Sequence, residues 1–123
     1  MEFEMLSNKI IGCAIEVHKI LGPGLLESAY RDCLCYELKE KGLEFITEKP
    51  VPIIYKGIKL DCGYRIDILV ENEIIIELKS IEGILPVHEA QILTYLKFAG
   101  KKVGLLINFN VTMLKHGLRR FVL

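Results

Sequence analysis

Residues 63–80, GYRIDILVENEIIIELKS, decide the fold, because they read as two apolar strands joined by a short polar turn. Near-continuous apolar runs of this length are typical of strands that are covered on both faces of a sheet. Three charged residues interrupt the runs, Asp67 in the first and Glu77 and Lys79 in the second. A buried carboxylate is costly unless a cation meets it. These residues therefore indicate a chemical site within the sheet.

The length of the turn decides whether Asp67 and Glu77 meet. A two-residue turn at Glu71-Asn72 would leave Asp67 and Glu77 on opposite faces of the hairpin. A three-residue turn, or one bulge, places Asp67 directly opposite Glu77. Glu77 and Lys79 are two residues apart on one strand and therefore share a face. A site that uses both carboxylates thus predicts an odd-length turn or a bulge.

The remaining segments predict a mixed α/β sheet flanked by helices. Apolar residues at steps of three and four indicate the helices, and glycine or proline marks their ends. Two prolines place the strand material before residue 60 at a sheet edge, and residues 55–58 suggest a tight hairpin. The segment from the third helix into the next strand should form a parallel β-α-β unit. The expected helices cover residues 5–21, 25–41 and 86–100, and the expected strands cover residues 44–60, 63–70, 73–80, 102–108 and 118–123.

Length and composition limit the class of protein. With 123 residues and 51% hydrophobic residues, the chain is expected to form one folded domain over residues 1–123. Sixteen basic and sixteen acidic residues balance, so any contact with nucleic acid must be local. No apolar run approaches the roughly 18 residues of a membrane span, and the first residues lack the form of a signal peptide. The four cysteines lack the spacing of a zinc site. A cytoplasmic location is expected.

Glu27 lies near the start of the second expected helix, and two explanations for it stay open. The helix dipole favours a carboxylate in the first turn. The helical phase, however, places Glu27 between Leu34 and Leu38 on the apolar, buried side. A carboxylate on the buried side is expected to point toward a specific group, and the strand carboxylates Asp67 and Glu77 are the candidates. In the first helix, His18 lies beside the apolar stripe and is expected to be partly exposed.

The tripeptide Glu-Leu-Lys has little specificity alone, since it occurs both at residues 77–79 and at residues 37–39 in an expected helix. The copy at 77–79 differs by its setting among isoleucines and by Asp67 on the neighbouring strand. The structural alternative is a cross-strand salt bridge between Lys79 and an acid, which contributes little when exposed.

An aspartate on one strand and Glu-x-Lys on the next, after a helix with a glutamate, resembles the PD-(D/E)XK nuclease superfamily. Residues 24–30, GLLESAY, match the pattern that names the GxxExxY proteins, a group placed in that superfamily. Ile66 stands where the superfamily name has proline. The similarity runs through IGCAIEVHKILGPGLLESAY, GYRIDILV, IIIELKS, PVHEAQILTYLK and GLLINF.

The resemblance implies a restriction-endonuclease-like core with an extra N-terminal helix and a Mg²⁺-dependent nuclease site, with Mn²⁺ as a substitute. Asp67, Glu77 and the backbone carbonyl of Leu78 would hold the metal, a hard cation suited to oxygen ligands. Lys79 would assist the attack of water on the phosphodiester. The remaining candidates are Glu27 for a second metal or its water shell, and Gln91, Tyr95 and Tyr30 for contact with the substrate or support of the metal ligands.

The expected partner is nucleic acid, either DNA or RNA, and a chain this short is expected to act on duplexes as a homodimer. The alternative is a catalytically silent nuclease-fold protein that serves as a nucleic-acid-binding or protein-interaction module. Zero net charge favours that alternative, whereas the intact set of carboxylates with Lys79 favours the enzyme. A third hypothesis is that the protein is a structural subunit of a larger assembly. Such a subunit would expose a wide apolar patch for its partner.

Overall fold

A five-stranded mixed sheet is the centre of the computed structural model, which describes residues 2–123. The strand order is β1-β4-β5-β6-β7, so β1 and β7 lie at the edges, as predicted. Strands β5 and β6 are parallel and the other neighbours are antiparallel, which confirms the β-α-β unit. The strands are β1 (Phe45–Pro50), β4 (Arg65–Val70), β5 (Ile74–Lys79), β6 (Val103–Asn108) and β7 (Leu118–Val122).

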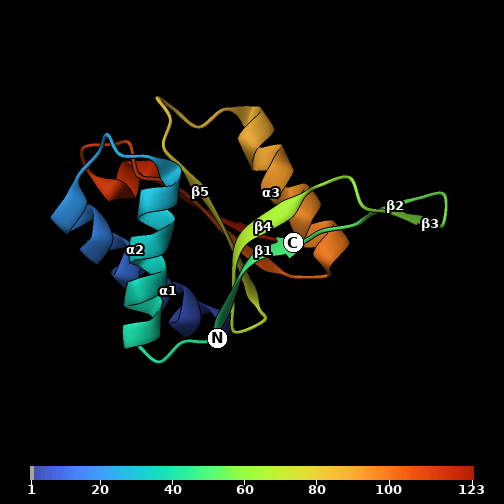
Figure 1. Ribbon diagram of the computed structural model, residues 1–123, viewed down its shortest axis with the longest axis horizontal. Coiled ribbons are helices and arrows are strands. Elements are labelled where there is room, and N and C mark those ends of the chain that lie inside the picture. The colour runs from blue at the N-terminus through green and yellow to red at the C-terminus, as the bar shows by residue number, and fades with distance from the viewer. Residues whose placement is uncertain (1) are drawn as a thin grey trace.

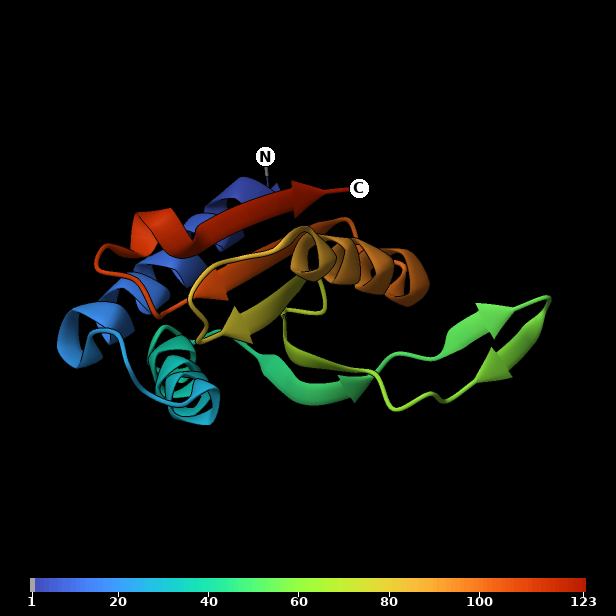
Figure 2. The same cartoon turned by 90° about the horizontal axis from the view of Figure 1, so that it is seen from above.

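Helices cover both faces of the sheet. The N-terminal helix α1 (Glu2–Leu21) and α2 (Glu27–Glu40) lie on one face, and α3 (Pro86–Ala99) lies on the other (Figures 1 and 2). Alternate residues of β5 enter two separate cores: Ile76 and Leu78 pack with α1 and α2, and Ile75 packs with α3. The burial of both faces explains the near-continuous apolar runs of β4 and β5. No helix within residues 2–123 is long and apolar enough to cross a membrane.

The ends of α3 follow from its sequence. Pro86 occupies the first turn, where its missing N–H costs nothing, and His88 Nδ1 accepts the N–H of Leu85 at 2.9 Å. The helix stops at Gly100, whose φ of 69° is the left-handed conformation that glycine adopts readily. A short 3₁₀ helix η1 (Leu114–Gly117) then leads into β7, where the sequence predicted a turn or short helix.

A second, two-stranded sheet leaves the main one. Strands β2 (Ile53–Tyr55) and β3 (Ile58–Leu60) pair only with each other and project beyond the rest of the molecule (Figures 1 and 2). Lys56 and Gly57 make the two-residue turn with φ of 49° and 79°, the conformation that matches strand twist. The tight hairpin over residues 55–58 is confirmed.

His18 differs from its expectation. It is buried with 9% of its surface exposed, and its Nε2 lies 2.7 Å from the carbonyl oxygen of Val111. The prediction of a partly exposed histidine is wrong because the loop after β6 covers this part of α1. Helical periodicity within α1 carries no information about so distant a segment of the chain.

Candidate functional site

The turn between β4 and β5 has three residues, 71–73. Its first two residues have left-handed φ values of 52° and 56°. The register pairs Ile68 with Ile76, and continuing it by one residue sets Asp67 opposite Glu77. The predicted odd-length turn is confirmed, and it brings the two carboxylates together.

Strands β4 and β5 separate next to this pair. β4 continues along β1 to Arg65, and β5 continues along β6 to Lys79, but in the described chain the β4–β5 pairing ends at Ile68 and Ile76. The opening between the two strands holds Asp67, Glu77 and Leu78, and we call these three residues the fork.

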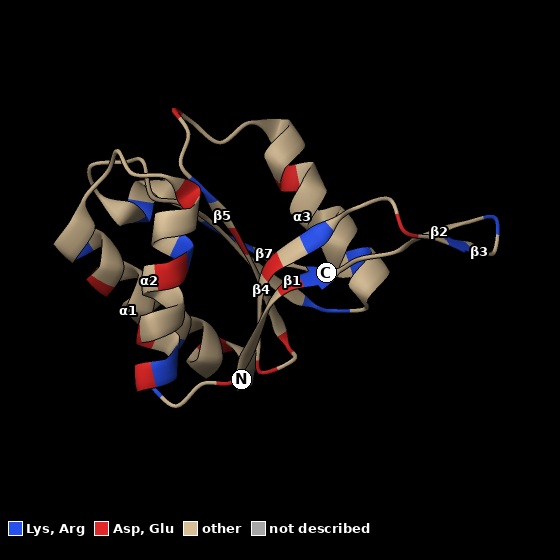
Figure 3. Ribbon diagram, in the orientation of Figure 1, with Lys and Arg blue, Asp and Glu red and all other residues tan. Residues whose placement is uncertain are grey.

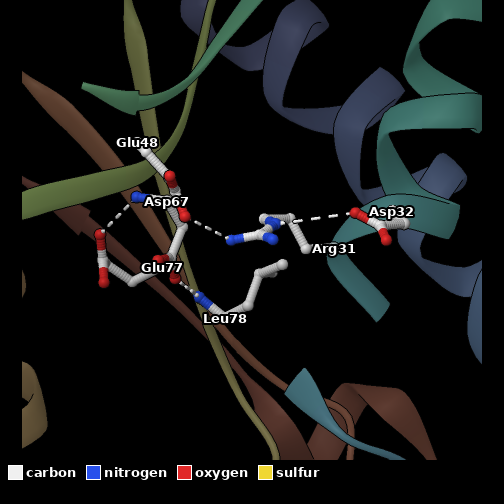
Figure 4. A network of polar contacts seen from close by, with 6 residues as sticks. All are labelled: Arg31, Asp32, Glu48, Asp67, Glu77 and Leu78. Atoms are coloured by element: carbon white, nitrogen blue, oxygen red, sulfur yellow. Dashed lines mark hydrogen bonds and ion pairs between the residues drawn. The ribbon is translucent and has the colours of Figure 1, made fainter. Parts of the chain in front are cut away.

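Side chains replace the main-chain ladder in the fork. The N–H of Asp67 donates to Glu77 Oε1 at 3.2 Å, and the N–H of Leu78 donates to Asp67 Oδ2 at 2.8 Å (Figure 4). Each carboxylate thus reaches across to the opposite strand through one oxygen. Its other oxygen is not used by these two bonds and can bind a further group.

Burial sets the protonation of the fork. Glu77 is 4% exposed, and its burial, together with the negative charge of Asp67, raises its pKa to about 8. The N–H of Asp67 and the charge of Lys79 act in the opposite direction. Burial also raises the pKa of Asp67, against the hydrogen bond from Leu78 and the charge of Lys79. Within the described chain, neither carboxylate has an ion-pair partner within 4.0 Å.

The donor set of the fork fits Mg²⁺. In an extended strand the N–H and C=O of one residue point toward the same neighbouring strand. The Leu78 N–H points at Asp67, so the Leu78 carbonyl faces the fork as well. Residues 2–123 contain no group of three or more acidic, histidine or cysteine side chains that could hold a metal. Two carboxylates and a carbonyl are nevertheless sufficient for Mg²⁺, which keeps several waters and binds substrate phosphates.

A cavity of about 720 Å³ lies beside the fork, and Lys79, Gln91 and Tyr95 line it. Gln91 Nε2 donates to the Tyr95 hydroxyl at 3.2 Å, which confirms that these two residues share a face of α3. Tyr95 is 4% exposed, and its pKa is raised by burial and then by the charges of Glu77 and Asp67. Its phenol therefore lies within electrostatic reach of both carboxylates.

Glu27 is the first residue of α2 and is exposed, so its predicted position on the buried side is wrong. A helical side chain packs over the turn that precedes it, and no turn precedes Glu27. The pKa of Glu27 is nevertheless raised, first by partial burial and then by the charge of Asp67, while Lys79 and Arg31 lower it. Glu27 therefore lies within electrostatic reach of Asp67.

A comparison with protein families matches residues 4–121 to the PD-(D/E)XK nuclease superfamily. The chain belongs to this superfamily. The five-stranded mixed sheet and three helices agree with its fold. Neither the comparison with curated proteins nor that with solved structures found a match.

Tyr30 lies in the core next to the segment that leads into α2. It is fully buried and stacks on Phe109 with ring centroids 4.5 Å apart. Its hydroxyl donates to the carbonyl of Gly22 at 2.5 Å and accepts the N–H of Leu25 at 3.2 Å. These bonds fix the loop that leads into Glu27. Of its two expected roles, contact with substrate or support, the buried position fits support.

Arg31 is a charged neighbour of the fork that was not predicted from the sequence. Its guanidinium lies 3.0 Å from a carboxylate oxygen of Glu48 on β1 and 3.8 Å from one of Asp32 (Figure 4). The charge of Arg31 opposes the rise that burial causes in the pKa of both Asp67 and Glu27. One signal was present, because Arg31 follows Glu27 by four residues and so lies on the same face of α2.

Asn108 was also missed, although it ends the apolar strand beside Lys79 in the β5–β6 register. It is 1% exposed, and its side chain accepts the N–H of Ile81 at 3.1 Å and donates to the carbonyl of Ile81 at 3.0 Å. Next to Ile81, Ser80 Oγ donates to the carbonyl of Leu25 at 2.6 Å. These bonds fix the end of β5 against β6 and against the segment before α2.

Proposed function

We propose that this protein is a nuclease that hydrolyses phosphodiester bonds of nucleic acid with a divalent metal, Mg²⁺ or Mn²⁺. The fork carries the proposal: Asp67 and Glu77 are opposed, partly or fully buried, and without an ion-pair partner among residues 2–123. Two buried carboxylates are costly unless a cation balances their negative charge, and a bound metal ion would supply it. Superfamily membership makes nucleic acid the expected substrate.

The narrower membership among the GxxExxY proteins is part of the same proposal. Residues 24–30 carry the pattern, and they contain Glu27 and Tyr30. Tyr30 holds the loop before α2, and Glu27, the first residue of that helix, lies within electrostatic reach of Asp67. The pattern thus contains both Glu27, which would act next to the carboxylates of the fork, and Tyr30, which holds the loop before Glu27 in place.

In this proposal, Asp67 and Glu77 each keep one oxygen on a backbone N–H and offer the other to the metal, with the Leu78 carbonyl as a further ligand. The bound metal would lower the pKa of a water molecule and polarise the scissile phosphate. Glu27 would bind a second metal or the waters of the first.

Lys79 and the α3 residues act on the substrate side of the fork. The Lys79 ammonium lines the cavity, where it would orient the attacking water and stabilise negative charge that develops on the phosphoryl oxygens. Gln91 and Tyr95 would contact the phosphate backbone or hold the ligands in place. Their mutual hydrogen bond fixes both side chains toward the cavity.

Calorimetric titration with Mg²⁺ and Mn²⁺ tests the metal site. We expect the wild type to bind and the Asp67→Asn, Glu77→Gln double variant not to bind. The Glu-Leu-Lys at residues 37–39 provides a matched control: Glu37→Gln, Lys39→Ala makes comparable changes within α2 and should bind as the wild type does. A wild type that binds neither ion, even with an oligonucleotide present, contradicts the proposal.

Cleavage assays on single-stranded and duplex DNA and RNA test the chemistry. Lys79→Ala should retain metal binding and lose at least about 10²-fold in cleavage rate, since it removes charge stabilisation in the transition state. Asp67→Asn should lose both properties. Cleavage that is unchanged in both variants rejects the assigned roles. Oligonucleotide binding without any cleavage would instead support the silent nuclease-fold alternative. The expected homodimer stays a prediction, which analytical ultracentrifugation would test.

A further inference from the structure

The hairpin that projects from the sheet exposes apolar side chains with no cover. We call residues 51–64, which comprise β2, β3 and their connections to the main sheet, the arm (Figures 1 and 2). Tyr55, Ile58 and Leu60 are 59%, 60% and 42% exposed. An isolated two-stranded hairpin is only marginally stable in water. Exposed apolar residues on such an element indicate a surface that a partner covers.

The two faces of the arm differ in character. Directly paired residues lie on the same face of a hairpin. The pairs Ile53–Leu60 and Tyr55–Ile58 make one face entirely apolar, and Ile54–Lys59 lies on the other. Lys56 occupies the turn, with its ammonium 5.6 Å from the centre of the Tyr55 ring. The apolar face therefore has a lysine at its tip and another behind it.

The positive charge of the arm is free to meet a ligand. Asp61 lies 3.3 Å from Arg65, so this acid is already paired. Lys56 and Lys59, together with Lys49 at the root, form no ion pair with any residue from 2 to 123. Figure 3 shows the basic residues of β3 and its turn at the far end of the arm. In a chain of zero net charge, this is a local positive excess.

Residues at the base of the arm line the cavity beside the fork. Ile53, Cys62 and Tyr64 line the same cavity as Lys79 and the α3 residues. The Tyr64 ring also meets the Tyr95 ring edge-on, with centroids 6.1 Å apart. A polymer that places a phosphate beside Lys79 would therefore pass the base of the arm.

We propose that the arm is a nucleic-acid-binding element that holds the substrate of the fork, an inference that rests on the proposed function. Tyr55 and Ile58 pack against bases, and Lys56 and Lys59 contact phosphates. Strand ribbons of this kind enter nucleic-acid grooves, where apolar side chains act as wedges and aromatic rings stack on bases. Charge argues for this partner over a second copy, because the unpaired lysines of the arm complement a polyanion, whereas a second arm carries the same positive charge.

Fluorescence anisotropy with a short labelled DNA, as single strand and as duplex, and with the RNA of the same sequence tests the arm. All proteins carry Asp67→Asn, so cleavage does not deplete the probe. Lys56→Ala, Lys59→Ala should flatten the slope of log affinity against log salt by about 1.8 for duplex or about 1.4 for single strands, as expected for two lost phosphate contacts. Tyr55→Ala, Ile58→Ala should weaken binding about tenfold with an unchanged slope.

A charge-matched control is Lys9→Ala, Lys41→Ala, which removes two lysines from the α1–α2 side of the molecule and should change neither quantity. Thermal unfolding of each variant checks that the main sheet is intact. Arm variants that bind as tightly as their parent, with the same salt slope, overturn the role of the arm and leave the proposed nuclease in place.

Two further outcomes also decide the matter. If the protein without any substitution neither binds nor cleaves any of the probes, the proposed function and the arm both fail. If ultracentrifugation finds a dimer that Tyr55→Ala, Ile58→Ala dissociates while oligonucleotide affinity is unchanged, the apolar face joins two copies of the chain. That result would replace nucleic acid as the occupant.

Discussion

Glu77→Gln should change how the stability of the metal-free protein depends on pH. The folded protein holds the pKa of Glu77 at about 8, against 4.5 for an ordinary glutamate. Between these values the folded state binds more protons than the unfolded state, so unfolding becomes easier as pH rises. The stabilising effect of the bound proton is complete below pH 4.5 and is lost as pH rises to about 8.

The size of the effect follows from the two pKa values. Each pKa unit corresponds to about 1.36 kcal/mol, so the full loss is on the order of 5 kcal/mol, of which about 2 kcal/mol falls between pH 6 and pH 8. Asp67 contributes in the same direction, because its pKa is raised too. In Glu77→Gln the amide oxygen can still accept the N–H of Asp67, but the side chain no longer titrates.

Thermal unfolding in EDTA from pH 5 to pH 9 measures the difference. Relative to Glu77→Gln, the wild type should lose roughly 8 °C in Tm between pH 6 and pH 8, at about 4 °C per kcal/mol for a chain of this size. Glu40→Gln, at the exposed end of α2, provides the control for removal of a charge outside the fork. Parallel pH profiles for wild type and Glu77→Gln would refute the claim that a buried carboxyl at this position titrates near pH 8.

Four other substitutions test the framework of the fold by thermal unfolding. Asn108→Ala should cost about 3 kcal/mol, because it leaves the main-chain N–H groups of Ile81 and Asn110 without their acceptor. Ser80→Ala should cost about 1 kcal/mol or less in stability and lower cleavage through displacement of the segment before α2, so an unchanged cleavage rate would count against that coupling. Gly117→Ala should cost about 3 kcal/mol, since a Cβ would lie 2.1 Å from the carbonyl oxygen of Asn108. Gly12→Ala lies within α1, where an added Cβ meets no atom within 4 Å, and should stabilise the protein by about 0.5–1 kcal/mol.

The parts of the fold that depend on local pattern were predictable from the sequence. Apolar runs located β4, β5 and β6, and Pro86 and Gly100 bounded α3 closely. The odd-length turn was predictable for a different reason. Side chains alternate between the two faces of a strand, so Asp67 can lie opposite Glu77 only with an odd-length turn or a bulge. A site that uses both carboxylates therefore predicted the length of the turn.

Contacts between distant segments were not predictable in this way. Arg31 meets Glu48 across α2 and β1, Asn108 holds Ile81, and His18 is covered by the loop that contains Val111. In each case the partner is set by the packing of whole elements, and helical or strand periodicity describes one element at a time. Glu27 shows the related failure at a helix start, where no preceding turn was present to bury the side chain that periodicity placed on the buried side.

The arm and the fork are neighbours because of the chain's topology. The arm is inserted between β1 and β4, and β4 separates from β5 at the end where the arm joins it. Only two residues separate Tyr64, at the base of the arm, from Asp67 in the fork. A nucleic acid held by the arm would therefore act on the same short segment that positions Asp67. The main chain of that segment pairs with β1 and meets β5 through the Asp67 and Glu77 side chains, so a shift of Asp67 on binding would leave the β5–β6 pairing that holds Glu77 and Lys79 in place.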